Sequence, residues 1–314
     1  MLIGHHLILD FLKKSQAKNK LAHAYLFVGP AHIGKRTTAL AFIQSLIGQD
    51  VTEDAHPDVL IIKPGIQETD KGKREAEITI EQIRSVKKQL SLSPHQAEYK
   101  VVLIDRAERM NRQAANSLLK TLEEPSQKSL LILISPSAHL LLPTIVSRCQ
   151  LIKFLPVKAE EIKKALAQEN TLPEKDFEKA VSLSAGRPGI ACRYLKEPVL
   201  LKEQDILMTD LREILKSDLN KRFQYAEQMA KDTGQAKEIL QWWLLWFRDL
   251  ALVGCGCSSL VVYPEAVGFY KQIQDRYPVL RIKLILEKIK ETILLLNNSS
   301  INGRLALEAL MLDI

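Results

Sequence analysis

Residues 26–36 read LFVGPAHIGKR, and this stretch decides the fold. Gly29, Gly34 and Lys35 fit the pattern G-x-x-x-x-G-K, which follows an apolar run at 25–28 and precedes a helix-like segment at 37–46. In such a loop the glycines let backbone N–H groups close around phosphate oxygens, and the lysine reaches the terminal phosphates. The stretch therefore predicts a strand, a phosphate-binding loop and a helix in an α/β fold.

The loop departs from the pattern in its last position. A Ser or Thr normally follows the lysine and holds Mg²⁺ through its hydroxyl. Here Arg36 follows, and Thr37 comes one place late. One position on a helix is a rotation of about 100°, so Thr37 is expected to point away from the metal. We expect a vestigial nucleotide site that requires no cofactor and binds ATP or ADP weakly.

A second departure lies at 100–105, KVVLID. This run predicts a buried parallel strand with Asp105 at its carboxyl end, where open α/β sheets bind their ligands. A hydrolytic site usually places a Glu directly after this Asp, to polarise the attacking water. Here Arg106 follows, and the nearest acid, Glu108, is predicted to point elsewhere. The two departures together predict a nucleotide-site fold that does not hydrolyse.

Composition indicates the general class of the protein. The 314 residues, 46% of them hydrophobic, suffice for two or three cores, and the net charge of +7 fits either a nucleic acid or acidic partner or scattered surface lysines. Four scattered cysteines favour a reducing compartment. The start lacks a signal-peptide pattern, and the apolar stretch 239–253 contains Arg248 and Asp249. We expect a cytoplasmic protein without a membrane segment.

Three regimes follow one another along the chain. Residues 1–156 alternate strand and helix patterns, which predicts a parallel α/β sheet. Residues 157–198 are short and helical, and 199–314 are all-helical, with a 3–4 apolar spacing from Ile282 to Leu296 that marks a buried face. The charged segment 64–77 is interpreted as a solvated loop. The expected strands are 25–28, 58–62, 100–104, 129–134 and 151–154, and the expected helices of the first regime are 35–47, 80–91 and 111–123.

Four stretches carry a family resemblance: LAHAYLFVGP at 21–30, RQAANSLLKTLEEP at 112–125, HLLLPTIVSRC at 139–149 and NGRLALEALML at 302–312. In order and spacing they resemble the AAA+ subunits of the bacterial DNA polymerase III clamp loader. The resemblance implies an AAA+ three-layer parallel-sheet core at 1–156, a small helical lid at 157–198 and an all-α collar domain at 199–314. The degenerate nucleotide site favours the delta-prime branch of this family over the ATP-hydrolysing gamma/tau branch.

The resemblance makes Arg148, within Ser147-Arg148-Cys149, an arginine finger that enters the ATP site of a neighbouring subunit. Arginine suits this role because its planar, permanently charged fork spreads over the oxygens of a γ-phosphate. Without the flanking match the same residue would be a surface arginine in a loop. Cys149 is interpreted as a small buried residue.

Other family positions are matched less completely. Ser135 occupies the polar sensor position, although a serine at a strand end is equally often a turn residue. The lid's sensor arginine is replaced by Gly189, with Arg187 two places earlier. Residues 47–60 lack the cysteines of the zinc module that relatives often carry, so no zinc is expected.

The resemblance also implies partners. These are gamma/tau and delta subunits in a hetero-oligomeric ring, the sliding clamp, and primer-template DNA as part of the complex. The alternative is an active gamma/tau-type motor, in which Thr37 would hold the metal and Glu108 the water. The tryptophans at 242, 243 and 246 could stack on bases, but core or subunit packing is the better interpretation, because no Lys or Arg is interleaved with them.

Overall fold

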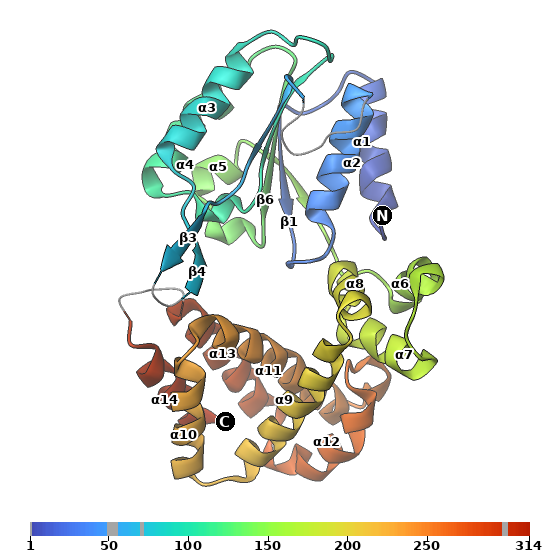
Figure 1. Cartoon of the computed structure of the whole chain (residues 1–314), viewed down its shortest axis with the longest axis vertical. Coiled ribbons are helices and arrows are strands. Elements are labelled where there is room, and N and C mark those ends of the chain that lie inside the picture. The colour runs from blue at the N-terminus through green and yellow to red at the C-terminus, as the bar shows by residue number, and fades with distance from the viewer. Residues whose placement is uncertain (1, 49–55, 70–71, 297–300) are drawn as a thin grey trace. The chain divides into compact units, whose positions relative to one another are not determined.

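The structure, a computed structural model, describes residues 2–48, 56–69, 72–296 and 301–314. It divides into two compact units (Figure 1). The first comprises residues 1–170 and 186–192, and the second comprises 171–185 and 193–314. The predicted lid, 157–198, is thus shared between the two units. The three domain boundaries given above stay a prediction.

The first unit is built on a parallel sheet that has five strands within the described residues, in the order β2-β5-β6-β1-β7. The strands are β1 (Ala24–Val28), β2 (Val59–Ile62), β5 (Lys100–Ile104), β6 (Ser129–Ser135) and β7 (Gln150–Lys153). The central strands β1, β5 and β6 are almost wholly buried, which explains their continuous apolar runs. All five strands predicted from the sequence are present, each within one residue at either end.

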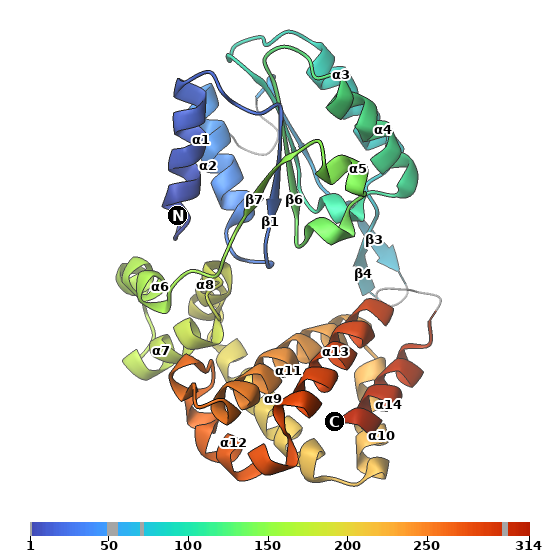
Figure 2. The same cartoon turned by 180° about the vertical axis from the view of Figure 1, so that it is seen from behind.

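Helices cover both faces of this sheet (Figures 1 and 2). One layer contains α1 (His6–Ala17) and α2 (Lys35–Ile47), and the other contains α3 (Ile80–Ser91), α4 (Arg112–Glu123) and α5 (Pro143–Val146). Because strand side chains alternate between faces, Phe27 packs into the core under α1 and α2, and Leu26 packs into the core under α3, α4 and α5. The predicted three-layer α/β core is confirmed.

One prediction for this unit is wrong. The segment 64–77 is not simply a solvated loop, because β3 (Ile66–Thr69) and β4 (Gly72–Glu75) pair there as a separate antiparallel hairpin. Its high charge hid the strands, since the pattern lacks the apolar alternation by which a half-buried strand is recognised.

The remaining helices are α6 (Ala159–Leu166), α7 (Glu174–Leu183), α8 (Pro188–Lys196), α9 (Val199–Lys216), α10 (Leu219–Ala230), α11 (Thr233–Gly254), α12 (Val267–Ile273), α13 (Val279–Leu295) and α14 (Gly303–Asp313). The all-helical character predicted for the C-terminal part is confirmed. In α13, Ile282 and Ile289 are buried, as the apolar spacing predicted.

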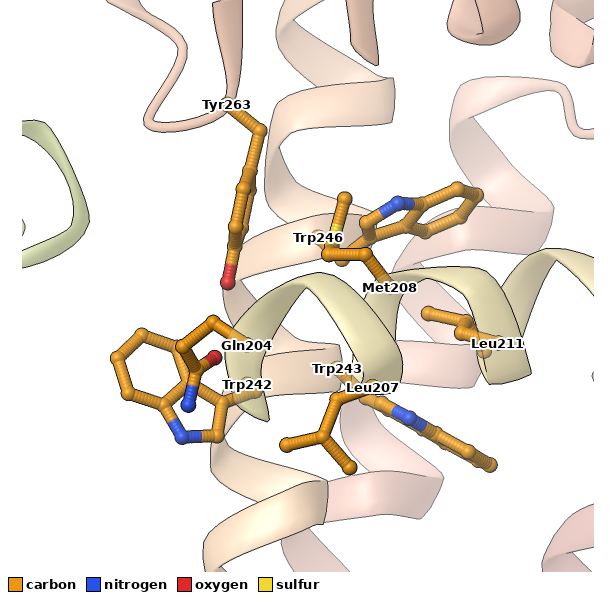
Figure 3. A pocket seen from close by; sticks show the side chains of 8 residues that line it. All are labelled: Gln204, Leu207, Met208, Leu211, Trp242, Trp243, Trp246 and Tyr263. Atoms are coloured by element: carbon orange, nitrogen blue, oxygen red, sulfur yellow. The ribbon is translucent and has the colours of Figure 1, made fainter. Parts of the chain in front are cut away.

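The tryptophans of α11 pack inside the helical unit. Trp243 stacks on Tyr225 of α10, and Trp246 meets Tyr270 of α12 edge to face at a centroid distance of 5.0 Å. Both indoles are buried, which confirms core packing for these two residues. Trp242 is half-buried and lines a small pocket together with Gln204 and Tyr263 (Figure 3).

Candidate functional site

The predicted phosphate loop connects β1 to α2 and depends on glycine. At Gly29 the backbone has φ 152°, and a Cβ there would lie 2.6 Å from the Phe154 carbonyl oxygen. A side chain at this position would therefore collide with backbone. Gly34, also with positive φ, is the N-cap of α2 and leads directly into Lys35. The strand, loop and helix follow one another as predicted; phosphate binding by the loop stays a prediction.

Lys35 is buried at the start of α2, where its ammonium group is anchored on the loop itself. It donates to the carbonyl oxygens of Gly29 and of Pro30, the latter at 2.7 Å. Burial lowers the pKa of Lys35 to about 8, although the nearby carboxylates of Glu108 and Asp105 oppose this shift. The lysine is therefore held beside the loop by backbone oxygens and is only weakly basic for a lysine.

Arg36 and Asp105 form an ion pair with each other. The Arg36 Nε lies 3.4 Å from the Asp105 Oδ2, and both side chains are only partly exposed. Arg36 stands where the metal-binding hydroxyl would stand, and Asp105 directly follows β5. A guanidinium carries a permanent positive charge, so it neutralises the Asp105 carboxylate that would otherwise be available to a magnesium ion. The first sequence departure, Arg36, therefore contacts Asp105, the residue directly before the second departure, Arg106.

Mg²⁺ does not fit this arrangement. It prefers octahedral oxygen ligands, and here the hydroxyl is missing and the aspartate is paired with a cation. Thr37, the nearest hydroxyl in sequence, is exposed in the first turn of α2. The next residue, Thr38, faces inward and donates to the Gly34 carbonyl at 3.0 Å. The helical rotation expected for Thr37 is therefore observed.

The prediction for Glu108 is wrong. Arg106 adopts a left-handed backbone with φ 55°, and a single 3-10 turn over Ala107–Arg109 follows it. This turn directs the Glu108 carboxylate into the site, where it interacts with Lys35 and with the Ser135 hydroxyl. Burial raises the pKa of Glu108, and its own backbone N–H, Ser135 and Arg106 partly oppose that shift. Its Oε2 atom is buried without a hydrogen-bond partner among the described residues.

Ser135 ends β6 as the sequence indicates, and its side chain is fully buried. Its hydroxyl donates to the Ser137 carbonyl at 2.9 Å, so it shapes the turn after the strand. Because the same hydroxyl also lies near Glu108, both interpretations of this serine fit its position.

Gly189 lies in direct backbone contact with the phosphate loop. Its N–H donates to the His32 carbonyl at 2.9 Å, and a Cβ at this position would lie 2.9 Å from the same oxygen. His32 itself has a left-handed backbone, with φ 62°. A larger residue at 189 would therefore displace the loop. Arg187 precedes the first residue of α8.

Arg148 lies away from the phosphate loop, at the other end of the strands. It precedes β7, whose first residue pairs with Tyr25 near the start of β1, whereas the loop follows the last residue of β1. Its guanidinium donates from Nη2 to Glu123 Oε1 at 2.8 Å and from Nη1 to the Thr144 carbonyl at 3.0 Å. About a third of the side chain, 35%, remains exposed.

The cysteine and metal predictions have different outcomes. Cys149 packs against the core under α4 and α5, and burial raises the pKa of its thiol to about 12, so it is not a reactive thiolate. Across the described residues no group of three or more His, Cys, Asp or Glu could hold a metal ion. Residues 49–55 of the zinc-module region lie outside them, and the absence of zinc stays a prediction.

No helix in the described part of the chain is long and apolar enough to cross a membrane. The cytoplasmic location expected from the sequence stays a prediction.

A family model described as DNA polymerase III, delta subunit matches residues 4–158, which contain the sheet and the phosphate loop. Over this part of the sequence the chain is similar to DNA polymerase III clamp-loader subunits. Its relatives include DNA polymerase III subunit delta' of Bacillus subtilis, 31% identical over 53% of this chain and 52% of that protein. The delta' subunit of Pseudomonas aeruginosa is 37% identical over 55% of each chain.

The tau subunit of Bacillus subtilis is also similar, at 27% identity over 66% of this chain and 39% of that protein. The chain thus spans about half the length of the delta' relatives it matches. The two delta' relatives confirm the resemblance to the delta-prime branch, which the sequence motifs indicated.

Proposed function

We propose that this chain is a non-hydrolysing subunit of the replicative clamp loader. It works in a hetero-oligomeric ring with gamma/tau and delta subunits and helps to load the sliding clamp onto primed DNA. In that ring it donates Arg148 to the ATP site of a neighbouring subunit. Its location is the cytoplasm, with the replisome.

The ion pair between Arg36 and Asp105 carries the first half of this proposal. Phosphoryl transfer to water needs a metal ion that bridges phosphate oxygens and neutralises the developing charge. An arginine that pairs with the metal-binding aspartate leaves that role unfilled. Gly29, Gly34 and Lys35 would still cradle a phosphate, so weak ATP or ADP binding without a required cofactor, and without zinc, is part of the proposal.

The position of Arg148 supports the second half. It lies at the opposite end of the strands from the chain's own phosphate loop, so it does not serve that loop. Its side chain, 35% exposed at the end of a short helix, is accessible to a neighbouring subunit. An arginine provided in trans in this way can raise the rate of hydrolysis by about 10³–10⁵.

A second candidate function is the gamma/tau-type ATPase motor, and the position of Glu108 favours it. That carboxylate faces Lys35 and Ser135, where it could orient a water molecule. Two observations oppose it: Thr37 is exposed rather than directed at the metal position, and Arg36 already pairs with Asp105. We therefore rank the motor second.

The ATPase rate of the isolated chain separates the two candidates. The wild-type chain is compared with Lys35→Ala at saturating ATP and Mg²⁺. The proposal predicts equal rates at background level. A turnover near the enzyme median of about 10 s⁻¹ that disappears in Lys35→Ala would establish the motor instead.

A further inference from the structure

The Arg148 side chain is held by two elements of the sheet-containing unit. One acceptor is Glu123, the last residue of α4, and the other is the Thr144 carbonyl within α5. The two helices pack against each other on the same face of the sheet (Figure 2). The backbone of Arg148 is fixed as well, because its N–H donates to the Ile145 carbonyl at 3.1 Å. Both the backbone and the guanidinium of Arg148 are therefore held by hydrogen bonds.

We infer that Glu123 is a positioning residue for Arg148. This inference rests on the proposed role of Arg148 in a neighbouring ATP site. The Glu123 carboxylate selects one direction for the guanidinium, so that the arginine meets an incoming γ-phosphate already oriented. Long side chains lose much rotamer freedom when they are ordered, and tethering before assembly removes part of that loss from the catalytic step.

The geometry of the pair favours orientation over neutralisation. Glu123 contacts only one of the guanidinium nitrogens, Nη2, and Thr144 contributes a neutral oxygen at Nη1. A bidentate carboxylate would occupy two N–H groups of the fork. Among the described residues no acceptor is found for the Nε–H group, and both side chains of the pair are substantially exposed. A solvent-screened contact of this kind leaves the arginine its charge and free donors for a phosphate.

The position of Glu123 in its helix also favours its pairing with Arg148. A negative charge in the last turn of a helix faces the negative end of the helix dipole, which is unfavourable. Glu123 is the final residue of α4, and the ion pair with Arg148 compensates for that position. Glu124, the next residue, is equally exposed but does not pair with Arg148, so it provides a matched control.

The test measures ATP hydrolysis by the reconstituted clamp-loader complex with DNA and clamp present. The variants of this chain are Glu123→Ala, Glu123→Gln, Arg148→Ala, the double variant Glu123→Ala/Arg148→Ala, and Glu124→Gln. We expect Glu123→Ala to lower kcat about 2- to 5-fold with KM for ATP unchanged, since an exposed ion pair is involved. Glu123→Gln, which retains a hydrogen-bond acceptor, should lower kcat less than Glu123→Ala does, and Glu124→Gln should leave kcat unchanged.

Two further readouts separate positioning from a general structural role. In the Arg148→Ala background, Glu123→Ala should cause no additional loss, because its effect passes through the arginine. The loss in Glu123→Ala should also shrink as the salt concentration rises, because salt screens the exposed pair in the wild type.

The outcomes also separate this inference from the proposed function. If Arg148→Ala leaves the rate unchanged, the proposed role of Arg148 fails and the inference fails with it. If Arg148→Ala slows hydrolysis but Glu123→Ala does not, or raises the rate, the positioning role is overturned while the finger stands. A Glu123→Ala loss that adds to that of Arg148→Ala would equally overturn it.

Discussion

Two arginine–carboxylate pairs stand at opposite ends of one parallel sheet, and they differ in their surroundings and in the exposure of the carboxylate. At the carboxyl ends of the strands, Arg36 and Asp105 pair beside a phosphate loop whose lysine is bonded to the loop's own carbonyls. At the amino ends, Arg148 pairs with Glu123; the two arginines are about equally exposed, at 36% for Arg36 and 35% for Arg148, but Glu123 is 49% exposed whereas Asp105 is 20% exposed. In the proposed function the first pair blocks a site within the chain, and the second presents a cation to a neighbouring subunit.

The comparison shows that the same chemical pair has opposite consequences in two environments. Under the proposal, the pair near the phosphate loop prevents hydrolysis, because its arginine stands in the metal position. Under the same proposal, the pair at the far end prepares the arginine for the ATP site of another subunit.

The largest effect on stability is expected at Gly189, which contacts the phosphate loop. A Cβ at Gly189 would lie 2.9 Å from the His32 carbonyl oxygen, so either the loop or the start of α8 must move. We expect Gly189→Ala to lower the free energy of unfolding by about 1–3 kcal/mol, the usual range for overpacking. Urea denaturation of the wild type and the variant measures this difference in the free energy of unfolding.

Gly268→Ala is the control for this experiment. Gly268 lies within α12, and a Cβ there would meet nothing within 4 Å. Alanine should therefore be neutral or stabilise by about 0.5–1 kcal/mol through its better helix propensity. Equal losses in both variants would show that the contact between Gly189 and His32 is not tight.

A pH effect is expected at Lys35, whose pKa burial lowers to about 8. The ammonium form, which a phosphate requires, prevails below that pH and is lost above it. The affinity for ADP should therefore fall by up to about tenfold between pH 7 and pH 9. Titration calorimetry at both pH values measures it. In Lys35→Arg the side chain stays charged, so this fall should disappear; its persistence would assign the titration to another group.

A smaller effect is expected from magnesium. Because Arg36 occupies the metal position, ADP binding by the wild-type chain should change less than twofold when Mg²⁺ is removed. Arg36→Thr restores the hydroxyl and releases Asp105, so Mg²⁺ should then strengthen binding about fivefold. Thr37→Ala should change nothing, since Thr37 faces solvent. Binding by the wild type that a chelator abolishes would contradict the role given to Arg36.

Much of the fold could be predicted because its signals are local. The buried strands are continuous apolar runs, and the helices 35–47 and 80–91 have the predicted ends, the second through a capping box at Thr79 and Gln82. The hairpin β3–β4 was not predicted, because charged strands outside a core have no apolar pattern. Helix α1 was not predicted either, although it buries Leu12.

The site was predictable in its parts but not in its contacts. The motif located Gly29, Gly34, Lys35 and Asp105, yet nothing in the spacing states that Arg36 reaches Asp105, 69 positions away. The Glu108 side chain was misplaced because a left-handed residue, Arg106, precedes it. Likewise, the pairing of Glu123 with Arg148 depends on how α4 and α5 pack, which the sequence pattern leaves open.

One measurement tests the contrast between the two ends of the sheet most directly: the DNA- and clamp-stimulated ATPase rate of the reconstituted complex, at equal assembly. Lys35→Ala disables this chain's own loop, and Arg148→Ala removes the cation presented to the neighbour. The account predicts an unchanged rate for Lys35→Ala and a strong loss for Arg148→Ala, poorly rescued by Arg148→Lys, because an ammonium lacks the bidentate fork. A loss with Lys35→Ala and an unchanged rate with Arg148→Ala would contradict it.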